Sequence, residues 1–384
     1  MSVTAAKGFL ASGVHSGMRR SAKDLAVVRS AIPATGAAMF TANRVQAAPV
    51  VVSKAHLAQA EPQAVVINSG SANAATGRRG ELDAIATTAE AARLLDLKSE
   101  QVLVLSTGVI GVRLSLDRML SGLRDAVPAL SPDGGHDAAE AIMTTDTLAK
   151  ESTVSSDGFT VGGMAKGAGM IHPVLATLLA VVTTDYRLEP GEAIEFLRPA
   201  VTQSFNRISV DGDCSTNDAV LLIANGASGA PRNDEAFSEA LREVCADLAR
   251  QVVKDGEGAT VILEVRVTGA ASDAEGTAIA RRIATSPLVK TAAFGRDPNW
   301  GRVLAAAGSA AHNGAFAQLD PDRASLSFNG TPVFVSGAPL DTSPDLSGAA
   351  CKIELDLGLG EGHAAYLASD LTYDYVRINA EYTT

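Results

Sequence analysis

The chain has 384 residues, of which 46% are hydrophobic and 20% are charged, so it is long enough for two units with cores of their own. Aromatic residues make up only 4% of the chain, which predicts a core of aliphatic side chains. The net charge of −11 at pH 7 argues against binding to nucleic acid or to an acidic membrane surface.

The first part of the chain predicts strands alternating with helices. Runs rich in valine, isoleucine and leucine predict buried strands at residues 50–53, 64–68 and 102–106. Helical spacing of alanine and leucine predicts helices at residues 81–95, 117–126 and 137–143. A strand edge at 158–163 then leads into a glycine-rich turn around Lys166.

The second part continues the mixture. We expect helices at 190–203, 234–253 and 273–285, and strands at 219–223, 261–267, 325–328, 332–335, 352–357 and 364–368. Residues 352–358 alternate with a period of two, which predicts one apolar and one solvated face. The glycine-rich segment 358–362 follows a strand and precedes another, so it predicts a hairpin rather than a nucleotide loop. The whole pattern indicates an α/β (α+β) chain in which sheets pack between helices.

Cysteine and histidine usage gives no sign of a metal site. Cys214, Cys245 and Cys351 are far apart and form no CxxC pair, so we expect no disulfide framework, no metal and no cofactor. Isolated thiols are typical of the reducing cytoplasm. The longest apolar run, 174–182, is too short to cross a membrane, and no secretory signal is visible at the N-terminus.

The most informative segment runs from Lys166 to Asp185. A glycine-rich turn is followed by Pro173, by the pair Ala176 and Thr177, and by the apolar run 178–182. A cut between Ala176 and Thr177 would give the threonine a free α-amine, whose pKa near ~7.7–8.0 lets it act as a base for the adjacent hydroxyl. The alternative is a threonine that fills a buried strand, and the residues alone favour that alternative.

Six ordered blocks are distributed along the chain between residues 106 and 382. They lie at residues 106–111 (Ser-Thr-Gly-Val-Ile-Gly), 141–147 (Ala-Ile-Met-Thr-Thr-Asp-Thr), 163–185, 255–260 (Asp-Gly-Glu-Gly-Ala-Thr), 294–302 (Phe-Gly-Arg-Asp-Pro-Asn-Trp-Gly-Arg) and 375–382 (Tyr-Val-Arg-Ile-Asn-Ala-Glu-Tyr). In these blocks the chain resembles a known family, the ornithine acetyltransferases. These enzymes of arginine biosynthesis are also called bifunctional glutamate N-acetyltransferase/amino-acid acetyltransferase.

The resemblance implies a layered fold of two α/β domains of the N-terminal-nucleophile type. It implies self-cleavage into an α chain, 1–176, which carries the oxyanion pair, and a β chain, 177–384, which starts at the nucleophile. It further implies a hetero-oligomer of the two chains, α2β2 or larger, in the cytoplasm.

The resemblance also implies the residues of the site. Thr177 is the nucleophile, Thr107 and Gly108 form the oxyanion hole, and the substrate-binding positions are Thr144, Lys166, Thr177, Glu257, Asn379 and Thr384. The substrates are N2-acetyl-L-ornithine and L-glutamate, and the use of acetyl-CoA as a second donor stays open. Without the resemblance, Ser106-Thr107-Gly108 is a strand-ending turn and Glu257 is a solvated turn residue. The motif 296–302 is interpreted as structural support.

Several positions depart from the family pattern. Val261 stands where lysine is usual and Thr383 where arginine or serine is frequent, so substrate preference is the property most in doubt. Further departures are at Ser71, Ala75, Val174 and Leu175. Two rival functions stay open: a hydrolase or aminopeptidase that uses the same self-generated threonine with water as acceptor, and a binding protein without catalysis.

Overall fold

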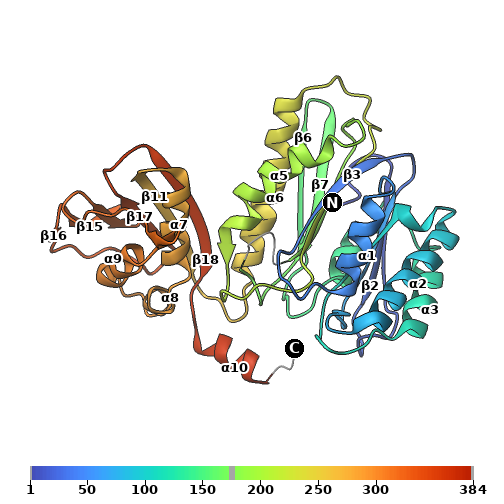
Figure 1. The fold of residues 1–384 in the computed structure, drawn as a ribbon, viewed down its shortest axis with the longest axis horizontal. Coiled ribbons are helices and arrows are strands. Elements are labelled where there is room, and N and C mark those ends of the chain that lie inside the picture. Colours follow the sequence, from blue (N-terminus) through green and yellow to red (C-terminus); the bar gives the residue numbers. More distant parts are fainter. Residues whose placement is uncertain (1, 173–177, 382–384) are drawn as a thin grey trace. The chain divides into compact units, whose positions relative to one another are not determined.

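A computed structural model describes residues 2–172 and 178–381. The described chain forms two compact units (Figure 1). Unit 1 holds Met1–Asn206 and Asp213–Val252, and unit 2 holds Arg207–Gly212 and Val253–Tyr382. The predicted cleavage point, between Ala176 and Thr177, lies outside the described residues. Its place in the sequence is inside unit 1, so the division into α and β chains is not the division into compact units.

Unit 1 contains two sheets. The first has the order β1-β2-β4-β5 and consists of β1 (Phe9–Val14), β2 (Leu25–Ser30), β4 (Ala64–Asn68) and β5 (Val102–Ser106). The second has the order β3-β10-β8-β7-β6 and consists of β3 (Thr35–Phe40), β10 (Ala219–Ala224), β8 (Leu179–Thr184), β7 (Phe159–Lys166) and β6 (Lys150–Ser156). The β4–β5 and β8–β10 pairs are parallel and the others antiparallel.

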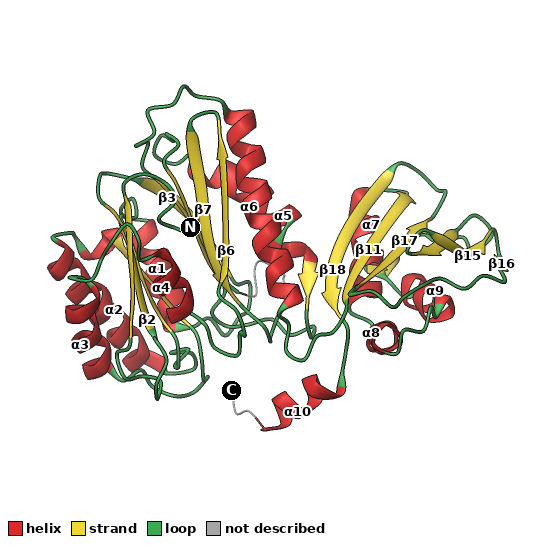
Figure 2. Ribbon diagram, turned by 180° about the vertical axis from the view of Figure 1, so that it is seen from behind, coloured by secondary structure: helices red, strands yellow, loops and turns green. Residues whose placement is uncertain are grey.

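The two sheets share one aliphatic core, to which both contribute inward-facing residues such as Val65, Ile67, Val181 and Leu221. Helices cover the outer faces (Figures 1 and 2). These helices are α1 (Ala48–Leu57), α2 (Gly77–Leu95) and α3 (Leu116–Ala126) beside the first sheet, and α5 (Ala193–Gln203) and α6 (Asp234–Lys254) beside the second. Helix α4 (Gly135–Ala141) contributes to the shared core. Short 3-10 turns lie at Ser99–Gln101 and Phe205–Arg207. The predicted arrangement of sheets between helices is confirmed in unit 1.

Unit 2 is built on one sheet with the order β16-β15-β14-β17-β11-β18-β9. Its strands are β16 (Ala338–Pro339), β15 (Thr331–Val335), β14 (Ser325–Phe328), β17 (Ala350–Asp356), β11 (Ile262–Ala270), β18 (Gly362–Ser369) and β9 (Ile208–Ser209). Its aliphatic core includes residues of α7 (Asp273–Ala284), α8 (Pro287–Phe294) and α9 (Trp300–Gly308). A small hairpin, β12 (Ala311–His312) and β13 (Ala315–Phe316), and a last helix, α10 (Tyr373–Glu381), complete it.

Two sequence predictions are wrong. Residues 50–53 belong to helix α1 and not to a strand. Pro49 stands in the first turn of that helix, where its missing N–H costs nothing. The face that α1 buries includes Val50, Ser53 and His56. Their spacing is helical, but two of the three are polar, so the pattern of apolar residues in the sequence does not reveal the helix. The Ser53 hydroxyl and the His56 ring are satisfied by carbonyls of β5, those of Val104 and Val102.

The segment 358–362 is not a hairpin. Strands β17 and β18 do not pair with each other, because β11 lies between them. The segment instead crosses the end of β11, where the N–H groups of Leu357 and Leu359 donate to the Thr268 and Gly269 carbonyls. Helix α10, which follows the last predicted strand, was not predicted from the sequence. The alternation predicted for β17 is confirmed by its alternating burial.

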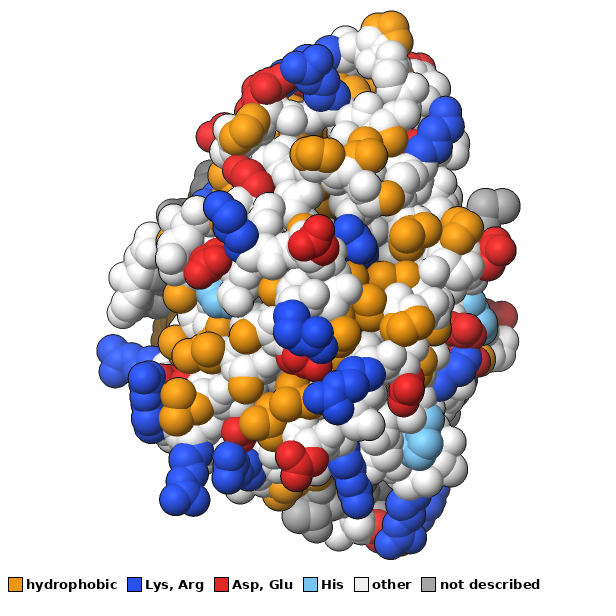
Figure 3. Space-filling model, turned by 90° about the vertical axis from the view of Figure 1, so that its right-hand side faces the viewer, with side chains coloured by type: hydrophobic (Ala, Val, Ile, Leu, Met, Phe, Trp, Pro, Cys, Tyr) orange, Lys and Arg blue, Asp and Glu red, His pale blue; other side chains and the backbone are white. Residues whose placement is uncertain are grey.

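The surface has mixed charge on the face in Figure 3, where basic and acidic side chains are interspersed with apolar ones. Within the described residues, no helix is both long and apolar enough to span a bilayer.

Candidate active site

The predicted oxyanion turn follows directly from β5. The Thr107 N–H donates to the Asn68 carbonyl at 2.9 Å, which holds the turn against the end of β4. Gly108 has a φ of +131°, and a Cβ placed there would lie 2.6 Å from Ser71 N and closer still to the Gly70 carbonyl carbon. The position therefore requires glycine on two counts, backbone conformation and close approach of another backbone.

Asn217 ties this turn to the second sheet. Its side-chain Nδ2 donates to the Ser106 carbonyl at 2.8 Å and to the Ala72 carbonyl at 2.6 Å. Its Oδ1 accepts from the Thr216 hydroxyl at 2.6 Å. Asn217 stands two residues before β10, so one buried amide fixes the oxyanion turn relative to the strands that follow the cleavage segment.

Lys166 brings a cation next to Thr107. It is the last residue of β7, pairs with Leu179 of β8 and is 8% exposed. Its Nζ donates to the Thr107 Oγ1 at 3.3 Å. The start of β10 is bonded to the residue just before β8, since Ala219 N donates to the Leu178 carbonyl at 2.9 Å. Thr107, Lys166 and the start of β8 therefore meet at one end of the sheet.

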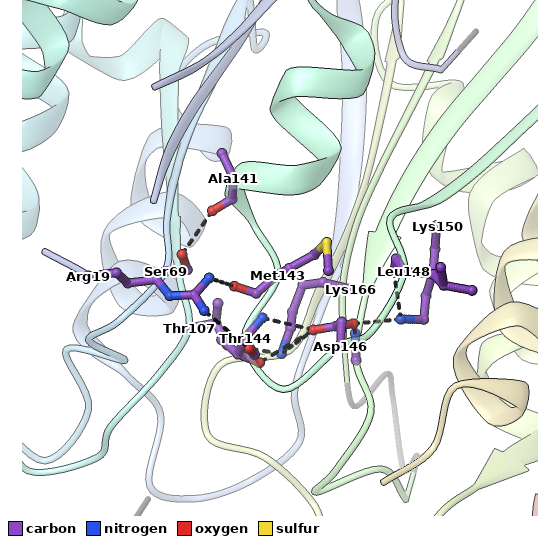
Figure 4. A network of polar contacts seen from close by, with 11 residues as sticks. Arg19, Ser69, Thr107, Ala141, Met143, Thr144, Asp146, Leu148, Lys150 and Lys166 are labelled. Carbon is purple, nitrogen blue, oxygen red and sulfur yellow. Dashed lines mark hydrogen bonds and ion pairs between the residues drawn. The ribbon is translucent and has the colours of Figure 1, made fainter. Parts of the chain in front are cut away.

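Asp146 connects the remaining predicted residues of unit 1 (Figure 4). Its Oδ2 accepts from Thr144 N at 2.9 Å, and its Oδ1 accepts from Gly167 N at 2.6 Å. Oδ1 also accepts from Lys150 Nζ at 2.7 Å, and Lys166 Nζ lies 3.9 Å from Oδ2. The side chains of Asp146 and Lys150 are 0% and 1% exposed.

The charge state of Asp146 follows from these contacts. Burial favours the neutral acid, but the nearby Lys166 and Lys150 ammonium groups, with the hydrogen bonds of Lys150 and Thr144, hold the pKa of Asp146 well below its usual range. Asp146 is therefore ionised at neutral pH.

The loop that carries Thr144 is also held from its carbonyl side. Arg19 donates to the Met143 carbonyl at 2.8 Å and to the Thr144 carbonyl at 3.4 Å. The Ser69 hydroxyl donates to the Ala141 carbonyl at 2.8 Å (Figure 4). Because the loop is bonded on both its N–H and its carbonyl groups, Thr144 has a defined position beside Lys166.

A second buried acid, Asp218, lies at the start of β10. It is 2% exposed, and its Oδ2 has no hydrogen-bond partner among the described residues. Burial raises its pKa well above the usual range, although a hydrogen bond to Ser215 and the charge of Lys166 oppose the change. Asp218 therefore keeps its proton to a higher pH than an exposed aspartate does, although the charge of Lys166 favours its ionised form.

Glu257 and Asn379 form a separate pair in unit 2. The Asn379 side-chain Nδ2 donates to Glu257 Oε2 at 2.8 Å, and both residues are partly or fully accessible to solvent. The Thr372 hydroxyl donates to the Gly258 carbonyl at 2.8 Å, so the end of β18 and helix α10 hold the glycine-rich loop. The structure thus brings together Thr107, Gly108, Thr144 and Lys166 in unit 1, and Glu257 with Asn379 in unit 2. Ala176, Thr177 and Thr384 lie outside the described residues.

The tryptophan motif supports the fold of unit 2. The Asn299 side chain caps helix α9 by accepting from Arg302 N at 3.1 Å. Trp300 stacks on Phe334 with 5.5 Å between ring centroids, and Arg296 donates to the Leu346 carbonyl at 3.1 Å. These contacts agree with the predicted supporting role.

Sequence reasoning missed Arg19, Lys150 and Asn217 and gave Asp146 no role. Asp146 stands inside the quoted block 141–147, so its place beside Thr144 was the available signal. Lys150 and Lys166 are 16 residues apart and meet only because β6 pairs with β7. No spacing in the sequence marks Arg19 or Asn217.

Comparison with known proteins identifies the family. The model of the ArgJ family matches residues 10–384. The arginine biosynthesis bifunctional protein ArgJ of Mycolicibacterium paratuberculosis is 48% identical over 394 residues, which cover 100% of this chain and 96% of that protein. The protein of the same name from Streptomyces coelicolor is 46% identical over 388 residues, which cover 100% of this chain and 100% of that protein.

Solved structures include a relative with a ligand. The ornithine acetyltransferase of Mycobacterium tuberculosis, crystallised with ornithine, is 44% identical over an alignment that covers 46% of this chain and 96% of that one, with a TM-score of 0.45. The resemblance predicted from the six sequence blocks is confirmed by the identity over the full chain, and this chain belongs to the ArgJ family of bifunctional arginine biosynthesis proteins.

Proposed function

We propose that this enzyme transfers an acetyl group from N2-acetyl-L-ornithine to L-glutamate through an acetyl ester on Thr177. The Thr177 hydroxyl attacks the acetyl carbonyl, its α-amine accepts the proton, and ornithine leaves. The α-amine of glutamate then attacks the ester, and N-acetylglutamate leaves. The observation that supports this best is the meeting of Thr107, Lys166 and the start of β8 at one end of a sheet.

The oxyanion turn supplies the stabilisation that both steps need. Attack on a carbonyl places negative charge on its oxygen, and one aimed donor contributes about 2.7–4 kcal/mol. Thr107 offers a hydroxyl and Gly108 a backbone N–H, in a turn whose shape depends on the close approach of Gly70 and Ser71 to Gly108. Lys166 Nζ, 3.3 Å from the Thr107 Oγ1, orients that hydroxyl by donating to it.

Substrate recognition needs charges of both signs. Lys166 meets the substrate carboxylate, with Thr144 beside it, and Glu257 meets the side-chain ammonium of ornithine, with Asn379 and Thr384 as further contacts. Val261 immediately precedes β11 and follows Glu257 by four residues, and the family usually has lysine at this position. We expect this difference to affect the choice of donor, including whether acetyl-CoA is accepted.

The nucleophile is produced by self-cleavage. The Thr177 hydroxyl attacks the Ala176 carbonyl, and the Ala176–Thr177 C–N bond breaks, which leaves an ester and a free α-amine on Thr177. Water then hydrolyses the ester and releases the Ala176 carboxylate and the Thr177 hydroxyl. The products are an α chain, 1–176, and a β chain, 177–384, assembled as α2β2 or larger in the cytoplasm. Intact mass under denaturing conditions tests this step: two fragments, one with Thr177 at its N-terminus, are expected, whereas one uncut chain from active protein would exclude the mechanism.

A hydrolase using the same threonine is the main rival, and full-length relatives at 45–48% identity do not favour it. Acetylornithine supplied with and without glutamate separates the two. We expect N-acetylglutamate to form with parallel initial-velocity lines, as a ping-pong mechanism requires. Release of acetate at a rate independent of glutamate would favour the hydrolase.

A further inference from the structure

The acceptor sites of Asp146 are fully used. A carboxylate has two oxygens and about four lone-pair sites. Oδ1 accepts from Lys150 Nζ at 2.7 Å and from Gly167 N at 2.6 Å. Oδ2 accepts from Thr144 N at 2.9 Å and, more weakly, from Thr144 Oγ1 at 3.5 Å. No acceptor site is left over for another close donor.

Lys166 lies near Asp146 but makes none of these hydrogen bonds. Its Nζ is 3.9 Å from Asp146 Oδ2, which is beyond hydrogen-bond distance, and it donates instead to Thr107 Oγ1 at 3.3 Å. A lysine and a carboxylate this close, both largely buried, normally form a direct charge-assisted hydrogen bond. Thr144 N occupies Oδ2, the oxygen that Lys166 approaches, while Lys150 binds the other oxygen, Oδ1, and offsets the negative charge that would draw Lys166 onto Asp146.

We infer that Lys150 is a positioning residue for the acyl-transfer site: by binding Asp146, it keeps the Lys166 ammonium directed toward Thr107 and available to the substrate carboxylate. This inference rests on the proposed role of Lys166 in carboxylate binding. Lys150 itself is 1% exposed and lies at the start of β6, so it acts through Asp146 and not by touching the substrate.

Removing the Lys150 ammonium redirects Lys166. In Lys150→Met an acceptor site on Oδ1 becomes free and Asp146 loses the cation that offsets its charge, so Lys166, whose Nζ is 3.9 Å from Oδ2, moves in to hydrogen-bond the carboxylate directly. Lys166 then turns away from Thr107 and from the substrate. Because a hydrogen bond to a charged group contributes ~1.5–3 kcal/mol, the KM for acetylornithine is expected to rise about tenfold or more, with a smaller change in kcat.

The experiment compares Lys150→Met, Lys150→Arg, Lys166→Met and the double variant Lys150→Met/Lys166→Met in acetyl transfer. Lys150→Arg keeps a cation that can bind Asp146 and is expected to stay within about threefold of the wild type. The control is Lys23→Met, which removes a surface lysine bonded to Asp137 at 2.5 Å and to Glu140 at 2.8 Å. This control loses two ion pairs of unit 1 that lie at its surface and is expected to leave the KM unchanged.

The double variant gives the decisive result. If Lys150 acts through Lys166, its removal adds nothing once Lys166 is methionine. Full additivity of the two KM effects, or an unchanged KM in Lys150→Met, would overturn the inference while leaving the acetyltransferase function intact. An unchanged KM in Lys166→Met would instead contradict the proposed role of Lys166. Should Lys150→Met fail to fold, Lys150→Gln, which keeps a donor but no charge, is expected to raise the KM at least threefold, and a KM equal to the wild type would refute the role.

Discussion

Asn217 offers the sharpest test of how the oxyanion turn is held. Its Nδ2 donates to the Ser106 and Ala72 carbonyls at 2.8 and 2.6 Å, and the side chain is 5% exposed. Asn217→Asp keeps the shape but places an acceptor against two buried carbonyls. Each carbonyl left without a donor costs about 1–3 kcal/mol, so for the two carbonyls the free energy of unfolding of unit 1 is expected to fall by about 2–6 kcal/mol.

The assay is urea unfolding at pH 7.5, followed by far-ultraviolet circular dichroism and by amide hydrogen exchange in β5 and β10. Tryptophan fluorescence is unsuitable, since the single tryptophan, Trp300, belongs to unit 2. The matched control is Asn225→Asp at the other end of β10. Asn225 Nδ2 makes two longer bonds, to the Lys7 carbonyl at 3.0 Å and the Ser30 hydroxyl at 3.2 Å, near the surface.

With a typical slope of roughly 1–3 kcal/mol per molar urea, the Asn217→Asp midpoint is expected to fall by about 1 M or more, against a few tenths for the control. Equal midpoints for the two variants would refute the reasoning, because they would show that the two buried bonds do not hold β5 to the segment before β10.

Three further outcomes follow from the structure. Gly108→Ala is expected to lose activity and to lower the unfolding midpoint, because the added Cβ meets the backbone of Gly70 and Ser71. Gly111→Ala is the control: Gly111 also has a positive φ, but an added Cβ meets nothing within 4 Å, so its effect should be smaller. Equal effects of the two variants would contradict the steric argument. Burial raises the pKa of Asp218, so the folded state holds this proton to a higher pH than the unfolded state, and the stability of Asp218→Asn relative to the wild type should grow as the pH rises above 3.8. A pH-independent difference would count against this reasoning. Burial lowers the pKa of Lys290 to about 8 although Asp211 and Asp370 oppose this, so between pH 8 and 10.5 the unfolded wild type holds a proton that the folded state has released. The wild type should then gain up to about 3 kcal/mol over Lys290→Met across that window, measured as unfolding free energy at each pH.

The sequence predicted several strands that are buried on both faces, because each is mainly a run of apolar residues. Strands β4 and β5 and most of β10 were located from such runs, and each is buried along its whole length. The same criterion misassigned residues 50–53, since a short apolar run fits a strand or a helix equally well. The pairing of β11 with both β17 and β18 could not be predicted, because the neighbours of a strand depend on contacts between distant parts of the chain.

The candidate site divides in the same way. Thr107, Gly108, Thr144 and Lys166 were found because they stand in blocks that resemble a family, and the structure brings them together. Asp146 and Lys150 provide the charges that surround them, yet a lone carboxylate between threonines and a lone lysine before a strand have no distinctive spacing. Their partnership depends on the loop 142–149 returning Lys150 to the end of the sheet beside Lys166.

The interleaved order of the second sheet explains how cleavage at residue 176 is compatible with a stable enzyme. In the order β3-β10-β8-β7-β6, strands β3, β7 and β6 precede the proposed cut, and β10 and β8 follow it. Strands β8 and β10 are buried at every position and lie between strands from the other side of the cut. Separating the two chains would therefore break the ladders of β3 with β10 and of β7 with β8, and would expose to water two strands that are buried at every position. Breaking the one peptide bond between residues 176 and 177 would remove none of these contacts, so the sheet that positions Lys166 beside Thr107 would be retained after the proposed cleavage.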